Sequence, residues 1–157
     1  MVYKPYFKYL DGPPPLSVSC RRMVRLEEVD VLGIVWHGRY AGYFEDGREE
    51  IGRQFGLSYI EFKQAGALLP IRTLHVDYLL PLHYLETFDL ETTMHWHEAA
   101  RLNIEYKIFN SERRLTTQGY SVQMMIDLEG NLLLEAPAFF RDFQKRWRLG
   151  ELTPCGY

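Results

Sequence analysis

Residues 37–55 read HGRYAGYFEDGREEIGRQF, and this stretch decides the fold. The residues that share one side of the predicted helix recur at steps of four, three, four and four: Tyr40, Phe44, Gly47, Ile51 and Phe55. This spacing is that of one face of an α-helix. The stretch therefore predicts a long amphipathic helix, and its apolar stripe must be covered by another layer of structure.

Three glycines interrupt this helix, at Gly42, Gly47 and Gly52. Each weakens a helix by roughly 1 kcal/mol relative to alanine, so three of them need a structural reason. We expect another part of the chain to pack very close to the helix backbone. A helix that lies in the curve of a sheet would meet this condition.

The chain on either side of the helix predicts that sheet. Alternation of residues gives a first strand over Ser17–Glu28, and Ser58-Tyr59-Ile60-Glu61 fits a capping box that opens a short second helix ending near Gly66. Four strand-like runs follow, over Leu69–Tyr78, Thr87–Glu98, Arg101–Asn110 and Leu115–Asp127. Pro137 is then expected to open a terminal helix through Arg148. Consecutive strands joined by short turns imply an antiparallel sheet, so the expected fold class is α+β.

The bulk properties bound the class of protein. A chain of 157 residues, 46 % of them hydrophobic and 25 % charged, suits one compact globular domain. A formal net charge of -3 gives no general attraction to nucleic acid. Cys20 and Cys155 form no CxxC pair, and we expect two free thiols in a reducing cytosol. With no signal-peptide run and no membrane-spanning stretch, the expectation is a cytoplasmic protein without membrane insertion.

The chain is expected to divide into an N-terminal arm over residues 1–16, a globular domain over 17–150 and a C-terminal tail over 151–157. The arm carries aromatic and aliphatic residues at Tyr3, Tyr6, Phe7, Tyr9 and Leu10. It ends in Gly12-Pro13-Pro14-Pro15, which forbids helix and stiffens the chain. We expect an extended arm that packs on the body or on a partner subunit.

The chemistry is expected just before the long helix. Asp30-Val31-Leu32-Gly33 breaks the strand pattern as a turn, which places an accessible carboxylate on a rigid scaffold. Asp30 could attack a carbonyl or activate water, and Gly33 lets the chain turn tightly. Residues 34–38 lead into the helix, whose first amides lack internal partners and favour negative charge. His37 could orient Asp30 or polarise a carbonyl.

The segment over residues 30–50 resembles the 4-hydroxybenzoyl-CoA thioesterase group of hotdog-fold proteins, and most closely its bacterial acyl-CoA thioesterase branch. Nine residues stand in the register of that group: Asp30, Gly33, Ile34, Val35, His37, Tyr40, Glu45, Arg48 and Glu50. Val29 stands where many relatives have threonine or cysteine, and Gly47 stands where they have alanine.

The resemblance implies a hotdog fold, in which an antiparallel sheet wraps around one long central helix. It implies hydrolysis of acyl-CoA thioesters by a homodimer or homotetramer, with the active site between two protomers and with no metal or redox cofactor. Asp30 and His37 would be catalytic. Substrate and oxyanion positioning would fall to Gly33, Val35, Trp36 and Tyr40, and Glu45 is a possible secondary acid.

Several alternatives stay open. The substrate could be carried by acyl carrier protein instead of CoA, or the chain could be a non-catalytic module that binds acyl-CoA. A hotdog dehydratase or hydratase would favour a His-x-x-x-x-Pro-Gly segment, which the sequence lacks. His95 with His97 and His75 with Asp77 share strand faces, but we expect no metal site because the spacings match no metal-binding motif.

Two further side-chain roles are expected. Glu45 and Arg48 lie three residues apart on the helix, which favours a structural ion pair. Arg101, at the tip before a strand, is the candidate for the CoA phosphates.

Overall fold

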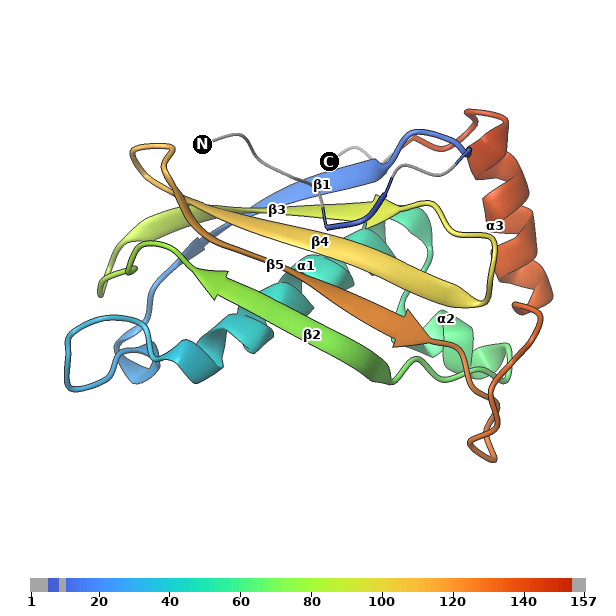
Figure 1. Cartoon of the computed structure of the whole chain (residues 1–157), viewed down its shortest axis with the longest axis horizontal. Helices are drawn as coiled ribbons and strands as arrows, with labels where there is room; N and C mark the ends of the chain where they lie inside the picture. The colour runs from blue at the N-terminus through green and yellow to red at the C-terminus, as the bar shows by residue number, and fades with distance from the viewer. Residues whose placement is uncertain (1–5, 9–10, 154–157) are drawn as a thin grey trace.

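The chain folds into a curved antiparallel sheet that wraps around one long helix, in a computed structural model that describes residues 6–8 and 11–153 (Figure 1). The strands are β1 (Leu16–Met23), β2 (Ile71–Tyr78), β3 (Thr87–His95), β4 (Arg101–Asn110) and β5 (Leu115–Met124). The helices are α1 (Tyr40–Phe55), α2 (Tyr59–Gln64) and α3 (Ala138–Arg148), with 3-10 turns η1 (Leu26–Glu28) and η2 (His37–Arg39). This confirms the predicted α+β hotdog fold.

The spatial order of the strands is β1-β3-β4-β5-β2, all antiparallel. β2 comes second in the sequence, yet it pairs with β5 at the far edge of the sheet. α1 and α2 lie between β1 and β2 in the chain, so they carry it from one edge of the sheet to the other.

The predicted first strand was too long. It ends at Met23, and Leu26–Glu28 forms the single turn η1 instead. The Glu28 carboxylate accepts a hydrogen bond from the amide of Arg25 at 2.7 Å and so caps that turn. β3 and β5 also end earlier than predicted, at His95 and Met124. The capping box at Ser58 and the helix after Pro137 are confirmed.

α1 approaches the sheet at one glycine. A Cβ atom at Gly47 would overlap the hydroxyl of Thr92 in β3, which confirms that Gly47 faces the sheet at close range. Gly52 is also crowded, because its Cβ would lie 3.0 Å from the Cα of Ser58. The expectation was wrong for Gly42, which is exposed and has no described atom within 4 Å of its Cβ position outside its own helix and neighbours.

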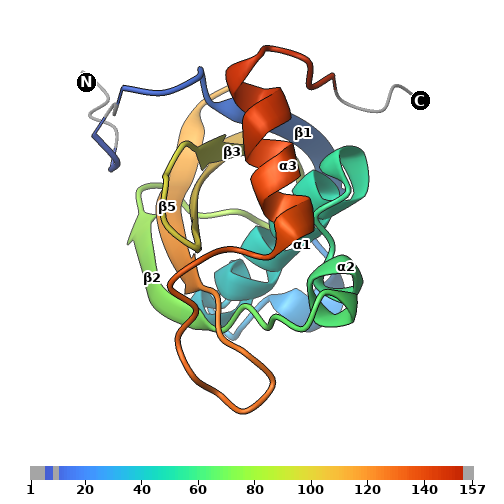
Figure 2. The same cartoon turned by 90° about the vertical axis from the view of Figure 1, so that its right-hand side faces the viewer.

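The core lies between α1 and the concave face of the sheet. The ring of Phe44 stacks on Tyr106 at a centroid distance of 4.3 Å. Gly119 makes room for this ring, because a Cβ there would lie 2.6 Å from it. α3 covers one end of the molecule and buries Phe140, Phe143 and Trp147 (Figure 2).

Part of the predicted arm packs on the convex face of the sheet. The hydroxyl of Tyr6 donates a hydrogen bond to Asp77, and Phe7 contacts His95 at a ring distance of 5.2 Å. Tyr3, Tyr9 and Leu10 of the arm, and Cys155 of the tail, lie outside the described residues. The boundaries of arm, domain and tail stay predictions.

Two of the strand histidines lie beside carboxylates. His75 Nε2 lies 3.0 Å from Asp77 Oδ1, and His95 Nε2 lies 3.3 Å from Glu105 Oε2. Among the described residues, no three His, Cys, Asp or Glu side chains come together in a way that could hold a metal ion. Within the same part of the chain, no helix has the length and apolar character needed to cross a bilayer.

Candidate active site

Asp30 sits in a turn that its own carboxylate helps to form. Its Oδ1 accepts a hydrogen bond from the amide of Leu32 at 2.8 Å, and its carbonyl accepts one from Gly33 at 3.0 Å. Gly33 has a φ of 74°, in the left-handed region that glycine adopts most readily. The side chain of Asp30 is therefore held in one place while remaining partly open to solvent.

This turn is fastened to the body on both sides. Val29 forms an antiparallel bridge to Val35, and Ile34 forms one to His83. The amide of Val35 donates to the carbonyl of Leu82 at 2.9 Å. The entry to the helix is consequently part of a small ladder, which fixes Asp30 relative to the start of η2.

The backbone bonds narrow the choice of oxyanion donors. The amides of Val35 and Trp36 already donate to the carbonyls of Leu82 and Glu28. Both residues were expected to position the substrate, but their amides are committed to the fold. His37 and Gly38 begin the helical segment, and their amides have no preceding helical carbonyl to bond. These two amides are therefore the candidate donors.

A cavity of about 360 Å³ opens beside this turn. Asp30, Val35, His37 and Tyr40 all line it, so the structure brings four of the predicted site residues together. Its remaining lining residues are Leu32, Ile34, Tyr78, Leu79, Leu80 and Pro81.

The far wall of the cavity was not predicted. Tyr78, at the end of β2, donates from its hydroxyl to the carbonyl of His37 at 2.9 Å. Its ring meets that of Tyr40 edge-on at 5.1 Å. The apolar run that follows, Leu79-Leu80-Pro81, completes the wall. That run after a strand was the only signal in the sequence, and it gave no indication of which element it would face.

An aromatic ring packs beside His37, and a second aromatic residue lines the cavity. The Trp36 ring lies 5.0 Å from the imidazole and covers Gly38, where a Cβ would overlap it. Burial raises the pKa of the Tyr40 phenol.

Glu45 and Arg48 do not form the ion pair that was expected. Arg48 is buried and donates from Nε to Gln123 Oε1 at 2.8 Å, with its guanidinium 4.8 Å from the centre of the Tyr59 ring. Glu45 accepts a hydrogen bond from the Tyr59 hydroxyl instead. Neither residue lines the Asp30 cavity.

Arg101 also lies far from this cavity in the same protomer. Tyr78 pairs with Thr117 of β5, and Arg101 pairs with Met124 of the same strand. Seven residues of strand span about 23 Å. Arg101 bonds to Asn103 Oδ1 at 2.9 Å, so in this chain it contacts its own strand and not the site.

Proteins of similar sequence indicate the family of the chain. Residues 24–146 match the thioesterase-like superfamily. A putative acyl-CoA thioesterase of Bacillus subtilis, YneP, is 30 % identical over 106 residues, which cover 68 % of this chain and 77 % of YneP. The chloroplastic acyl-acyl carrier protein thioesterase ATL3 of Arabidopsis thaliana is 31 % identical over 102 residues, covering 63 % of this chain and 54 % of ATL3.

Solved structures show the same fold. A DHNA-CoA thioesterase from Staphylococcus aureus superposes with a TM-score of 0.77 at 24 % identity, covering 86 % of this chain and 91 % of that one. A 1,4-dihydroxy-2-naphthoyl-CoA thioesterase from Synechocystis gives 0.74 at 20 % identity, covering 88 % and 99 %.

Proposed function

The chain belongs to the thioesterase-like superfamily and is a thioester hydrolase, and we propose that it cleaves acyl-CoA esters to free acid and CoA in the cavity of Asp30. One observation carries this proposal. Asp30, whose carboxylate is held by its own turn, and His37, which begins the helical segment, line the same cavity. Hydrolysis of a thioester needs a nucleophile or base and donors for the oxyanion, and the first amides of this segment are the proposed donors.

Asp30 is the proposed nucleophile or general base. In the nucleophilic route its carboxylate attacks the thioester carbonyl, the CoA thiolate leaves, and water then cleaves the acyl-aspartyl anhydride. In the other route Asp30 removes a proton from a water molecule that attacks directly. Both routes develop an oxyanion, which the amides of His37 and Gly38 would stabilise; one such donor is worth about 3 kcal/mol. Neither route needs a metal or a redox cofactor.

Three more of the predicted residues have a proposed part in this chemistry. His37 lines the cavity and would orient Asp30 or polarise the carbonyl. Tyr40 lines it as well, and Gly33 shapes the turn. The cavity is open, and we propose that a second protomer completes it. We also propose that the protein acts in the cytoplasm.

Acyl carrier protein is the second candidate for the carrier, because ATL3, a relative at 31 % identity, is an acyl-acyl carrier protein thioesterase. The catalytic residues would be the same. The two carriers are separated by assaying matched acyl groups on each.

The test combines a substrate panel with one substitution. A set of acyl-CoA and acyl-carrier-protein esters is assayed with a thiol reagent, and Asp30→Asn is assayed on the best of them. The substitution keeps size and the turn hydrogen bond but removes the charge. We expect kcat to fall by at least 100-fold with little change in KM, because the carboxylate acts in the transition state.

Asp127→Asn is the matched control. Asp127 also accepts backbone hydrogen bonds in a turn, from Glu129 at 3.0 Å and Asn131 at 2.8 Å, but it lies in the loop after β5 and lines no part of the Asp30 cavity. It should leave kcat unchanged. Near-normal turnover by a folded Asp30→Asn enzyme would refute the mechanism. Release of no thiol from any ester by the unmodified protein would indicate a binding module instead.

A further inference from the structure

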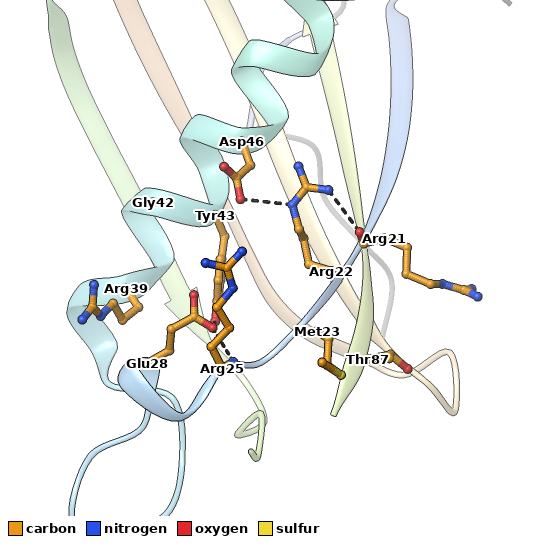
Figure 3. Close-up of a pocket in the computed structure, with 10 residues that line it drawn as sticks. All are labelled: Arg21, Arg22, Met23, Arg25, Glu28, Arg39, Gly42, Tyr43, Asp46 and Thr87. Carbon is orange, nitrogen blue, oxygen red and sulfur yellow. Dashed lines mark hydrogen bonds and ion pairs between the residues drawn. The ribbon is translucent and has the colours of Figure 1, made fainter. Parts of the chain in front are cut away.

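A second and larger cavity lies on the other side of the entry to α1. It has a volume of about 770 Å³ and lies between α1 and β1 (Figure 3). Its lining residues are Arg21, Arg22, Met23, Arg25, Glu28, Arg39, Gly42, Tyr43, Asp46 and Thr87. Sequence reasoning passed over these arginines because they are scattered between a strand, a turn and a helix start.

The lining of the cavity has more arginines than carboxylates. Four arginines and two carboxylates line it, and a third carboxylate, that of Asp89, pairs with Arg21 from outside the lining at 2.8 Å. Both lining carboxylates are already used by the fold. Glu28 Oε2 accepts from the Tyr43 hydroxyl at 2.9 Å as well as from the Arg25 amide, and Asp46 accepts from Arg22 at 3.2 Å.

Arg25 and Arg39 have the weakest ties among the four arginines. Arg25 reaches Glu27 only at 3.8 Å, and both side chains are largely exposed, so this pair contributes little. Arg39 donates to the backbone carbonyl of Glu27 at 2.9 Å. Both arginines therefore contact Glu27, one from the turn and one from the helix start. Each guanidinium has five N–H groups, so most of these stay available to a ligand.

Gly42 also lines the cavity, on the surface of α1. No described atom lies within 4 Å of its Cβ position outside the helix, so the wall of α1 is bare at this point. A cavity of this volume falls in the range of sites that bind small molecules. Arginine forks match phosphate geometry and can also stack on an aromatic base.

We propose that this cavity binds the phosphorylated adenosine portion of coenzyme A, with Arg25 and Arg39 as the principal phosphate ligands. The inference rests on the proposed function and adds to it by selecting the carrier. The two cavities share the same turn and helix start. Glu28 and Arg39 line the nucleotide cavity two residues from Asp30 and His37, and two residues span at most about 7 Å. The pantetheine arm would pass along this segment to the thioester.

The test measures how much the nucleotide of CoA raises kcat/KM. The kcat/KM values of one acyl group are compared on CoA and on pantetheine, which lacks the nucleotide, for Arg25→Gln, Arg39→Gln and the double variant. Each single change should lower the preference for the CoA ester by about 10-fold, since each removes a charge-assisted contact. Arg141→Gln is the control, because Arg141 lies on α3, pairs with Glu135 and lines neither cavity.

Binding of adenosine 3′,5′-bisphosphate, measured by calorimetry, tests the cavity without turnover. The unmodified protein should bind it, the double variant should not, and added salt should weaken it. An unchanged preference for CoA over pantetheine in the double variant would overturn the inference while leaving the proposed function intact. Loss confined to acyl-carrier-protein esters would overturn it in favour of a protein carrier. If no ester is hydrolysed, the proposed function is wrong. The calorimetry still shows whether the cavity binds the nucleotide.

Discussion

Asp30 has one role in the turn and a proposed role in the cavity. Its carboxylate closes the turn by accepting from Leu32, and it lines the cavity where a thioester would react. The ladder through Val35 and Ile34 holds this turn against the body, so the acid is positioned by backbone bonds and not by side-chain packing. Substitutions at Asp30 should therefore change chemistry more than folding.

His37 should matter less than Asp30. His37→Ala removes a group that orients or polarises, and we expect kcat to fall by about 10- to 1000-fold. The fold should survive, because the His37 side chain is exposed and the Tyr78 hydroxyl bonds its backbone carbonyl, which alanine keeps. Circular dichroism and a thermal melt check the fold alongside the assay. A change in melting temperature with unaltered kcat would show a purely structural histidine.

The candidate site was predictable only where it is local in the chain. Asp30, His37 and Tyr40 lie within eleven residues, and spacing alone could place them around one turn and helix start. Tyr78 could not be found, because its position depends on β2 lying beside that helix start. Arg48 was assigned to Glu45 for a similar reason, since its partner Gln123 is 75 residues away.

Among the elements, α1 and β3 set how closely the layers pack. Thr92 of β3 lies directly under Gly47, and Leu90 lies 3.1 Å from the position of a Cβ there. The helix period predicted which side of α1 faces the sheet. The strand order could not be predicted, because local patterns describe each strand but not which edge β2 joins.

Two glycines of α1 provide a matched test of this packing. Gly47→Leu should lower the free energy of unfolding by roughly 1–3 kcal/mol or more, because the side chain would be forced against Thr92. Gly42→Ala should raise it by up to about 1 kcal/mol, because alanine favours helix and the site is open. Chemical denaturation of both variants measures the difference. Equal stabilities would mean that α1 does not approach β3 at Gly47.

On the scale of the whole molecule, β1 and β2 are the edge strands of the described sheet, and β2 is the edge with exposed apolar side chains. β2 pairs with β5 on one side, and no described strand pairs with it on the other. It exposes Ile71, Leu74 and Tyr78 at 49, 42 and 52 %. An edge of this length with apolar side chains tends to pair with another chain.

We therefore expect a dimer or tetramer at micromolar concentration, as the proposed shared active site requires. Sedimentation velocity would show a species at two or four times 18.6 kDa. Replacing Leu74 with lysine should shift the population toward monomer and reduce activity with it. A single 18.6 kDa species with full activity would exclude an active site that depends on a second protomer.

Trp36 gives the protein an optical property. The chain has three tryptophans, and Trp36 is 46 % exposed, whereas Trp96 and Trp147 are buried and lie 5.2 Å apart. Indole emission moves to longer wavelength in water, so Trp36 supplies the red part of the fluorescence spectrum, which dissolved quenchers reach. The buried pair supplies the blue part. Because the Trp36 ring touches His37, a molecule entering the Asp30 cavity would alter the red emission alone, without any added label.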